Sequence, residues 1–106
     1  MLYKFKSGAT ADLVMLEPAG HRLLEVLGRE PSDKGIFESA DLPDLMRQLE
    51  RAIEQEEAML DEAQRQAQGK GQTLVRPEVS LRQRLWPMRE MMRRSHAQGQ
   101  PIVWGV

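Results

Sequence analysis

The chain has 106 residues, of which 41% are hydrophobic and 29% charged, and its formal net charge is −1. This length and balance suit one globular domain spanning residues 1–106, and a nearly neutral chain has no global field that would draw it to nucleic acid or to an anionic membrane. The absence of cysteine excludes disulfides, thiolate catalysis and thiolate-held metals, and it fits the cytoplasmic location that we expect.

The N-terminal segment predicts a β-hairpin. Leu2–Lys6 alternates apolar and basic side chains, which is typical of a half-buried strand and leaves no apolar core for a signal peptide. Ser7–Thr10 has turn residues, and Asp12–Leu16 is a second strand. Because this second strand is apolar on both faces, it is predicted to lie at a central position in the sheet.

Two elements follow the hairpin. Pro18 suits the first turn of a helix, and Gly28 suits its C-terminal end. One side of this helix carries Gly20, Leu23, Leu24 and Leu27. After a loop, Ile36 and Phe37 form a candidate short strand.

The strongest helix signal starts at Asp41, a candidate N-cap, with Pro43 in the first turn. Its apolar stripe comprises Leu42, Leu45, Met46, Leu49, Ile53, Leu60 and Ala63. From Gln64 onward the chain is polar and contains glycine, so residues 64–77 are predicted to be a flexible loop.

A third helix is predicted from the capping-box pattern of Ser80 and Gln83 to Gly99. Its apolar face comprises Leu81, Leu85, Met88, Met92 and Ser95, with Met91 at the margin. Pro87 lies inside this helix, which predicts either a kink or a restart at Trp86.

The apolar segment Ile102–Val106 predicts a docked C-terminal strand, since free chain ends fray. We expect it beside Leu2–Lys6 of the same chain, the alternative being strand addition to a second subunit. The fold class is therefore α+β, with the order β-β-α-(β)-α-α-β. We expect a small antiparallel or mixed sheet of three or four short strands with three helices on one face.

Charge is segregated along the chain. Residues 41–62 carry eight acids and two arginines, and residues 63–98 carry eight basic residues and two acids. Helical spacing places Glu50, Glu54, Glu57 and Asp61 on one stripe, and Arg82, Arg89 and Arg93 on another beside Trp86. The simplest interpretation is that the second and third helices pack antiparallel with these stripes facing each other.

Two sharper interpretations of these stripes remain open. The carboxylates could hold a divalent metal, although carboxylates on one helix do not surround an ion. The arginines and Trp86 could bind a nucleic acid or a small anion by phosphate contact and stacking. The sequence shows no recognisable Ser/His/Asp set and no phosphate-binding loop, so we assign no catalytic, cofactor-binding or metal-binding residue.

Glu56 departs from the apolar pattern, because helical geometry places it in the stripe between Ile53 and Leu60. A buried unpaired carboxylate is unfavourable. We expect Glu56 to find a basic partner, to be protonated, or to reach solvent.

Four segments together resemble one protein family: Met1–Ser7, Val14–Pro18, Ser80–Pro87 and Val103–Val106. The chain resembles domain-of-unknown-function family 1840, small single-domain proteins of proteobacteria. The resemblance implies a bacterial source and transfers no functional residue.

The residues thus favour a non-catalytic interaction or structural protein, including a homodimer, and the seven methionines suit adaptable contact surfaces. The candidate interaction surface comprises Arg82, Trp86, Arg89, Arg93 and Glu56. The alternative is a binding module for small anions or nucleic acid on the arginine and tryptophan face. An enzyme would need a site formed between subunits.

Overall fold

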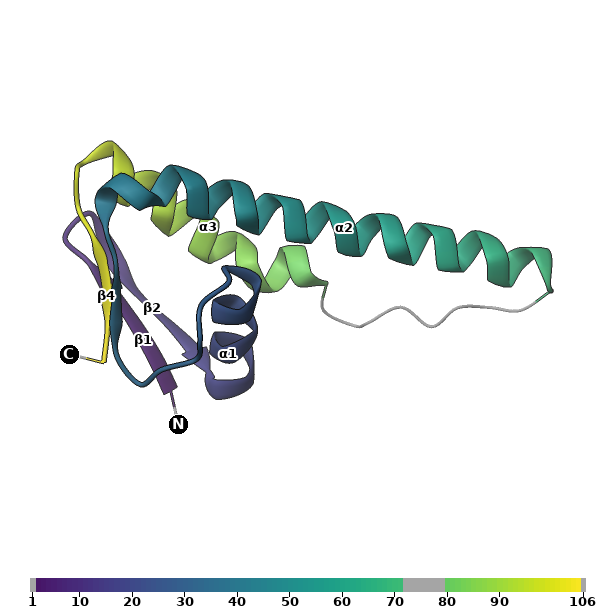
Figure 1. Cartoon of the computed structure of the whole chain (residues 1–106), viewed down its shortest axis with the longest axis horizontal. Helices are drawn as coiled ribbons and strands as arrows, with labels where there is room; N and C mark the ends of the chain where they lie inside the picture. The colour runs from purple at the N-terminus through teal and green to yellow at the C-terminus, as the bar shows by residue number, and fades with distance from the viewer. Residues whose placement is uncertain (1, 72–79, 106) are drawn as a thin grey trace.

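The computed structural model describes residues 2–71 and 80–105 (Figure 1). The elements in chain order are β1 (Leu2–Ser7), β2 (Thr10–Leu16), α1 (Glu17–Val26), β3 (Gly35–Phe37), the 3₁₀ turn η1 (Ser39–Asp41), α2 (Leu42–Gly69), α3 (Leu81–Ala97) and β4 (Ile102–Trp104). The α+β class and the predicted order of elements are confirmed.

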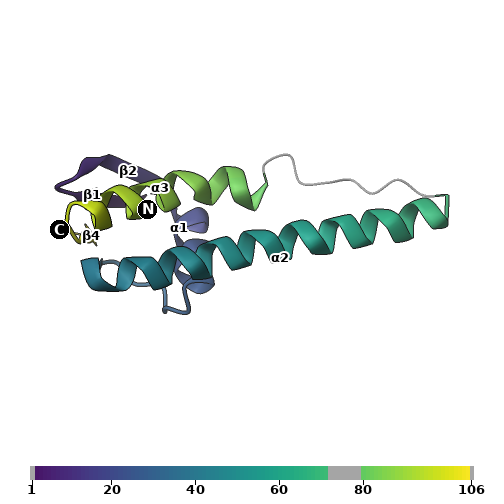
Figure 2. The ribbon, with the colours of Figure 1, turned by 90° about the horizontal axis from the view of Figure 1, so that it is seen from above.

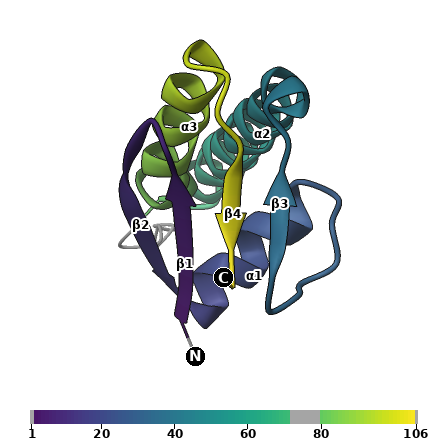
Figure 3. The ribbon, with the colours of Figure 1, turned by 90° about the vertical axis from the view of Figure 1, so that its left-hand side faces the viewer.

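The four strands form one antiparallel sheet in the order β2-β1-β4-β3, and Figure 3 shows all three helices behind one face of it. Strand β4 lies between β1 and β3, with Phe5 opposite Trp104 and Phe37 opposite Ile102. The C-terminal strand therefore docks within its own chain, beside the predicted N-terminal strand.

The prediction of a central position for β2 was wrong, because β2 is an edge strand with β1 as its one neighbour in the sheet. Its inward side chain Met15 is buried, whereas Val14 and Leu16 on the other face are 52% and 68% exposed. The apolar character of both faces of β2 therefore reflects an uncovered apolar surface, and only one face is buried.

The inner face of the sheet carries a cluster of buried aromatic rings. The ring centroid of Trp104 lies 5.5 Å from that of Phe5 and 4.7 Å from that of Phe37, and all three side chains are at most 2% exposed. The indole Nε1–H of Trp104 donates to the carbonyl of Ser32 at 3.1 Å. Gly35 lies opposite Trp104, where any Cβ would overlap the indole ring.

Helix α1 covers the sheet with Gly20, Leu23 and Leu24, and it ends before Gly28, which adopts φ +71°. Gly28 thus follows the C-terminal end of this helix as predicted, in a left-handed conformation that would strain any other residue. Asp41 precedes α2 as expected, but its side chain forms no capping hydrogen bond. The preceding 3₁₀ turn holds Asp41 in helical geometry, from which a side-chain cap does not form.

Helix α2 is 28 residues long, about 42 Å at 1.5 Å per residue. Only its first half is anchored in the core, by Leu42, Leu45, Leu49 and Ile53. The second half projects past the start of α3 (Figure 1).

The start of the predicted loop at residue 64 was wrong, because α2 continues to Gly69; residues 72–79 lie outside the described residues. The segment after Gln64 lacks apolar periodicity because it does not pack against the core. It is still helical, since glutamine, arginine and alanine are good helix formers. A hydrogen bond of 2.6 Å from Arg65 to Glu62 supports this last part of α2.

Helix α3 begins with the predicted capping box, in which the hydroxyl of Ser80 accepts from the Gln83 amide and the Gln83 side chain accepts from the Ser80 amide. It continues through Pro87 to Ala97 as one helix, so it does not restart at Trp86. The predicted apolar face is confirmed, since Leu81, Leu85, Met88, Met91, Met92 and Ser95 are all buried. Ser95, which is fully buried, bonds the Ser7 hydroxyl at 2.8 Å.

Candidate functional site

The charged stripes of α2 and α3 meet where these helices run antiparallel (Figure 2), and we call this contact the α2–α3 seam. Arg82 binds Glu57 with two bonds, Nε to Oε2 at 3.2 Å and Nη2 to Oε1 at 2.8 Å. Arg89 Nε donates to Glu50 Oε1 at 2.9 Å. The sequence therefore identified both helix faces that meet in the seam.

Arg93 does not take part in the expected cross-helix pairing. Its Nε donates to Glu90 of the same helix at 3.1 Å, and Glu90 also accepts from Arg89 at 2.9 Å. Glu50, Arg89, Glu90 and Arg93 thus form one continuous chain of ion pairs. The spacing of the arginines alone could not distinguish a partner on α2 from one on α3.

Trp86 lies between two guanidinium groups of its own helix. The guanidinium carbon of Arg82 is 5.3 Å from the ring centroid, and that of Arg89 is 4.9 Å from it. This cation–π arrangement holds both arginines on the flank of α3. The tryptophan is 37% exposed, so it borders the seam without being enclosed by it.

Glu56 caps the start of α3 from the neighbouring helix, an outcome that none of the three sequence expectations named. Its Oε2 accepts the backbone N–H of Leu81 at 2.9 Å, and the carboxylate is half-buried. The first N–H groups of a helix lack partners within that helix, and its N-terminus favours negative charge. No sequence signal links these residues, which lie 25 positions apart.

The ion pairs of the α2–α3 seam shift the pKa values of their members so that the charged forms are favoured. A hydrogen bond from Arg82 holds the pKa of the Glu57 carboxyl below its usual range, while Glu57 raises the pKa of Arg82. Bonds from Arg93 and Arg89 lower the pKa of Glu90 in the same way. Both carboxyl groups are therefore stabilised in the charged form by the fold.

These pKa shifts predict a loss of stability in acid. A carboxyl whose pKa is lower in the folded state stabilises the fold above its unfolded pKa, ordinarily about 4.3. That stabilisation is lost as the pH falls through the lowered folded value. Urea unfolding between about pH 5 and 3 should therefore show a shallower decline for Glu57→Gln than for the wild type, with Glu30→Gln, which removes an exposed carboxylate outside the seam, as the control. An equal decline in all three would contradict the role of the seam.

The seam offers little room for an added ligand, because carboxylates already occupy the arginines. Among residues 2–71 and 80–105, no group of three His, Asp or Glu side chains is close enough to hold a metal ion. The same residues contain no helix with the length and apolarity needed to cross a membrane.

A second surface was not singled out from the sequence: the uncovered face of the sheet and the edge of β2. Leu2 lies opposite Leu16 in register, with Val14 two residues along, and their side chains are 61%, 68% and 52% exposed. We call these three residues the apolar corner. The sequence did contain a signal for this surface, because β2 is apolar on both faces. That pattern was interpreted as burial of both faces.

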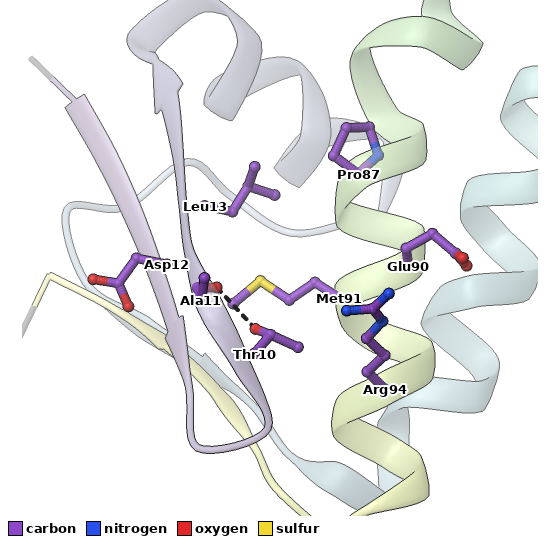
Figure 4. A pocket seen from close by; sticks show the side chains of 8 residues that line it. All are labelled: Thr10, Ala11, Asp12, Leu13, Pro87, Glu90, Met91 and Arg94. Carbon is purple, nitrogen blue, oxygen red and sulfur yellow. Dashed lines mark hydrogen bonds between the residues drawn. The ribbon is translucent and has the colours of Figure 1, made fainter.

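Shallow hollows flank this edge of the sheet. One of about 270 Å³ lies between β2 and α3 (Figure 4), and one of about 460 Å³ lies between the end of β2, the start of α1 and Arg84.

A family model described as "Domain of unknown function (DUF1840)" matches residues 1–104.

The chain belongs to the DUF1840 family.

The resemblance inferred from the four segments is thereby confirmed over nearly the whole chain of this DUF1840 protein. Neither the curated proteins nor the solved structures contain a match to it. The family description assigns no chemistry to any residue.

Proposed function

We propose that this DUF1840 protein is a non-catalytic protein-interaction module that self-associates through the outer face of its sheet. The observation that carries the proposal is the apolar corner, in which Leu2, Val14 and Leu16 lie side by side and more than half exposed. Contiguous exposed apolar side chains favour an interaction site over a solvated surface. The three helices leave this face of the sheet open (Figure 3).

A second copy of the chain suits this face because a two-fold interface brings the same patch of each subunit together. The apolar corner would then bury itself against its own copy, at the ~10 Å spacing of packed sheets. Lys4 and Asp12, which form an ion pair of 3.7 Å beside the corner, supply both signs of charge at the border. The interface would therefore be complementary to itself.

The methionines do not support this surface. Met15, Met88, Met91 and Met92 are buried in the core, where they fill space rather than contact a partner. Among the methionines that the structure describes, Met59 is the one that is largely exposed, at 72%, and it lies on α2 away from the sheet.

The alternative function, an anionic-ligand or nucleic-acid site on Arg82, Trp86, Arg89 and Arg93, stays a prediction. An incoming phosphate would have to displace the carboxylates of Glu50, Glu57 and Glu90, so the contacts of the seam do not favour it.

Sedimentation velocity from low to high micromolar concentration tests the proposed self-association. We expect the wild type to shift from monomer to dimer, and Leu2→Lys to remain monomeric because it places a charge in the apolar corner. Met59→Lys is the matched control, since it replaces an apolar residue elsewhere that is at least as exposed as Leu2, and it should still dimerise. A wild type that stays monomeric throughout, or a Leu2→Lys variant that dimerises like the wild type, would overturn the proposal.

A further inference from the structure

The two edges of the sheet are protected very differently. The β3 edge is three residues long, which is the brevity that natural sheets use to avoid unwanted pairing. The β2 edge is seven residues long, contains no lysine or proline, and has β1 as its one neighbour in the sheet. Within residues 2–71 and 80–105, the other side of β2 thus presents backbone N–H and C=O groups without strand partners, which is a template for an added strand.

The two hollows beside β2 follow this free edge one after the other. The first is lined by Thr10–Leu13 and by Pro87, Glu90, Met91 and Arg94 of α3. The second is lined by Val14–Leu16, Pro18, Ala19 and Arg84. We call the two together the edge groove. Because both hollows are shallow and bordered by the same strand edge, they suit an extended chain better than a compact small molecule.

The α3 side of the edge groove is one helical face. Arg84, Pro87, Met91 and Arg94 are spaced by three, four and three residues, so they point in the same direction. Figure 4 shows Pro87, Met91 and Arg94 on the side of α3 next to β2, with the thioether of Met91 directed at the strand. The groove thus has an apolar middle and an arginine at each end.

Both arginines are exposed, and the residues that the structure describes offer neither of them an ion pair. This distinguishes them from Arg82, Arg89 and Arg93, whose guanidinium groups are bound by carboxylates. Glu90 and Asp12 also line the groove. The Glu90 carboxylate is held by Arg89 and Arg93, and the Asp12 carboxylate pairs with Lys4 at 3.7 Å. The charge left for a ligand in the groove is therefore positive.

The distance between Arg84 and Arg94 determines how far apart two acidic side chains of an extended chain must be to reach both. Ten helical positions separate them (94 − 84), which is about 15 Å along α3. An extended chain covers this distance in about four residues at ~3.4 Å each. Residues four apart on a strand point to the same face, so both acidic side chains could face α3 at once.

A second copy of the chain fits the edge groove poorly. Two-fold antiparallel pairing of β2 with β2 would set the α3 helices of the copies alongside each other, with Arg84 of one near Arg94 of the other. This juxtaposition of like charges is unfavourable. A nucleic acid would satisfy the arginines but not the row of backbone groups on β2, which pairs with a peptide backbone.

We propose that the edge groove binds an extended acidic peptide of a partner protein, which pairs with the free edge of β2 and places acidic residues at positions i and i+4 on Arg94 and Arg84. An apolar residue at i+2 lies over Pro87, which is exposed beside the buried Met91. The edge groove shares Val14 and Leu16 with the apolar corner, whereas Leu2 belongs to the corner alone.

Fluorescence anisotropy with defined peptides tests this proposal on the full chain. The probe is a labelled seven-residue peptide with glutamate at its third and seventh positions, valine at its fifth and threonine elsewhere. The matched probes replace both glutamates with glutamine, or move the second glutamate to the sixth position, which turns it to the opposite face. We expect binding of the first probe only, weakening as salt is added.

The protein variants test the arginines one at a time. Arg84→Gln and Arg94→Gln should each weaken binding of the acidic probe about 3- to 10-fold. Arg51→Gln, which removes an exposed arginine from α2, should leave it unchanged. Hydrogen exchange should show the amides of Thr10–Leu16 becoming protected on binding, because strand addition gives them partners.

The proposal is overturned if the wild type fails to bind the acidic probe, binds the glutamine probe equally well, or shows protection at the seam instead of at β2. It is also overturned if both groove variants bind like the wild type. The Leu2→Lys variant should bind the peptide normally, so a failure of self-association and a failure of peptide binding are read separately.

Discussion

Replacing Trp104 with alanine is expected to lower the free energy of unfolding by about 3–5 kcal/mol. The side chain is 2% exposed and contacts Phe5, Phe37 and Gly35 at the centre of the sheet. Its removal leaves a cavity against neighbours that cannot close over it. It also leaves the carbonyl of Ser32 without its indole donor.

A loss of this size is a large part of the 5–15 kcal/mol that stabilises a typical domain. Urea unfolding followed by far-ultraviolet circular dichroism measures it, with an unchanged m-value showing that the loss lies in the folded state. Trp86→Ala is the matched control. That side chain is 37% exposed and forms two cation–π pairs, so its loss should stay below about 2 kcal/mol. Equal effects of the two variants would contradict the central role of β4.

Replacing Glu56 with alanine is expected to lower the free energy of unfolding by about 1–3 kcal/mol. The change removes the acceptor of the Leu81 N–H at the start of α3 and the negative charge that this helix terminus favours. Urea unfolding gives the total effect. Amide hydrogen exchange at Leu81 gives the local effect, since this amide should lose protection ahead of the rest of α3.

Two further variants separate the contact from general effects of charge. Glu54→Ala removes an exposed carboxylate on the same helix and should change stability by less than about 0.5 kcal/mol. Glu56→Gln keeps an acceptor oxygen and loses only the charge, so its effect should be smaller than that of Glu56→Ala by more than half. If Glu54→Ala and Glu56→Ala destabilise equally, Glu56 does not act as the cap of α3.

The features that the sequence predicted well are those set by neighbouring residues. The hairpin follows from alternation in Leu2–Lys6, and the capping box follows from Ser80 and Gln83, because both signals act within a few residues. The buried face of α3 follows from its spacing in the same way. Even the seam followed from two helical stripes of opposite charge, since helices joined in sequence pack side by side.

The features that it missed depend on what covers a surface. The pattern of β2 shows that both faces are apolar but not that no helix lies over one of them, so the position of β2 was wrong. The polar tract after Gln64 shows that nothing packs there but not that the helix ends. The partner of Glu56 is a backbone amide, which every residue but proline possesses, and side-chain types therefore give no indication of it.

The place of β4 in the sheet has a consequence for how the protein is made. Strands β1 and β3 are synthesised well before the strand that joins them, since Phe37 precedes its partner Ile102 by 65 positions (102 − 37). At 5–20 residues per second the ribosome takes roughly 3–13 s to cover that distance. Throughout this time β3 has no strand partner, β1 is paired with β2 alone, and Phe5 and Phe37 lack their contacts with Trp104. A nascent chain of this kind should engage chaperones on the ribosome until residues 102–104 emerge and close the sheet.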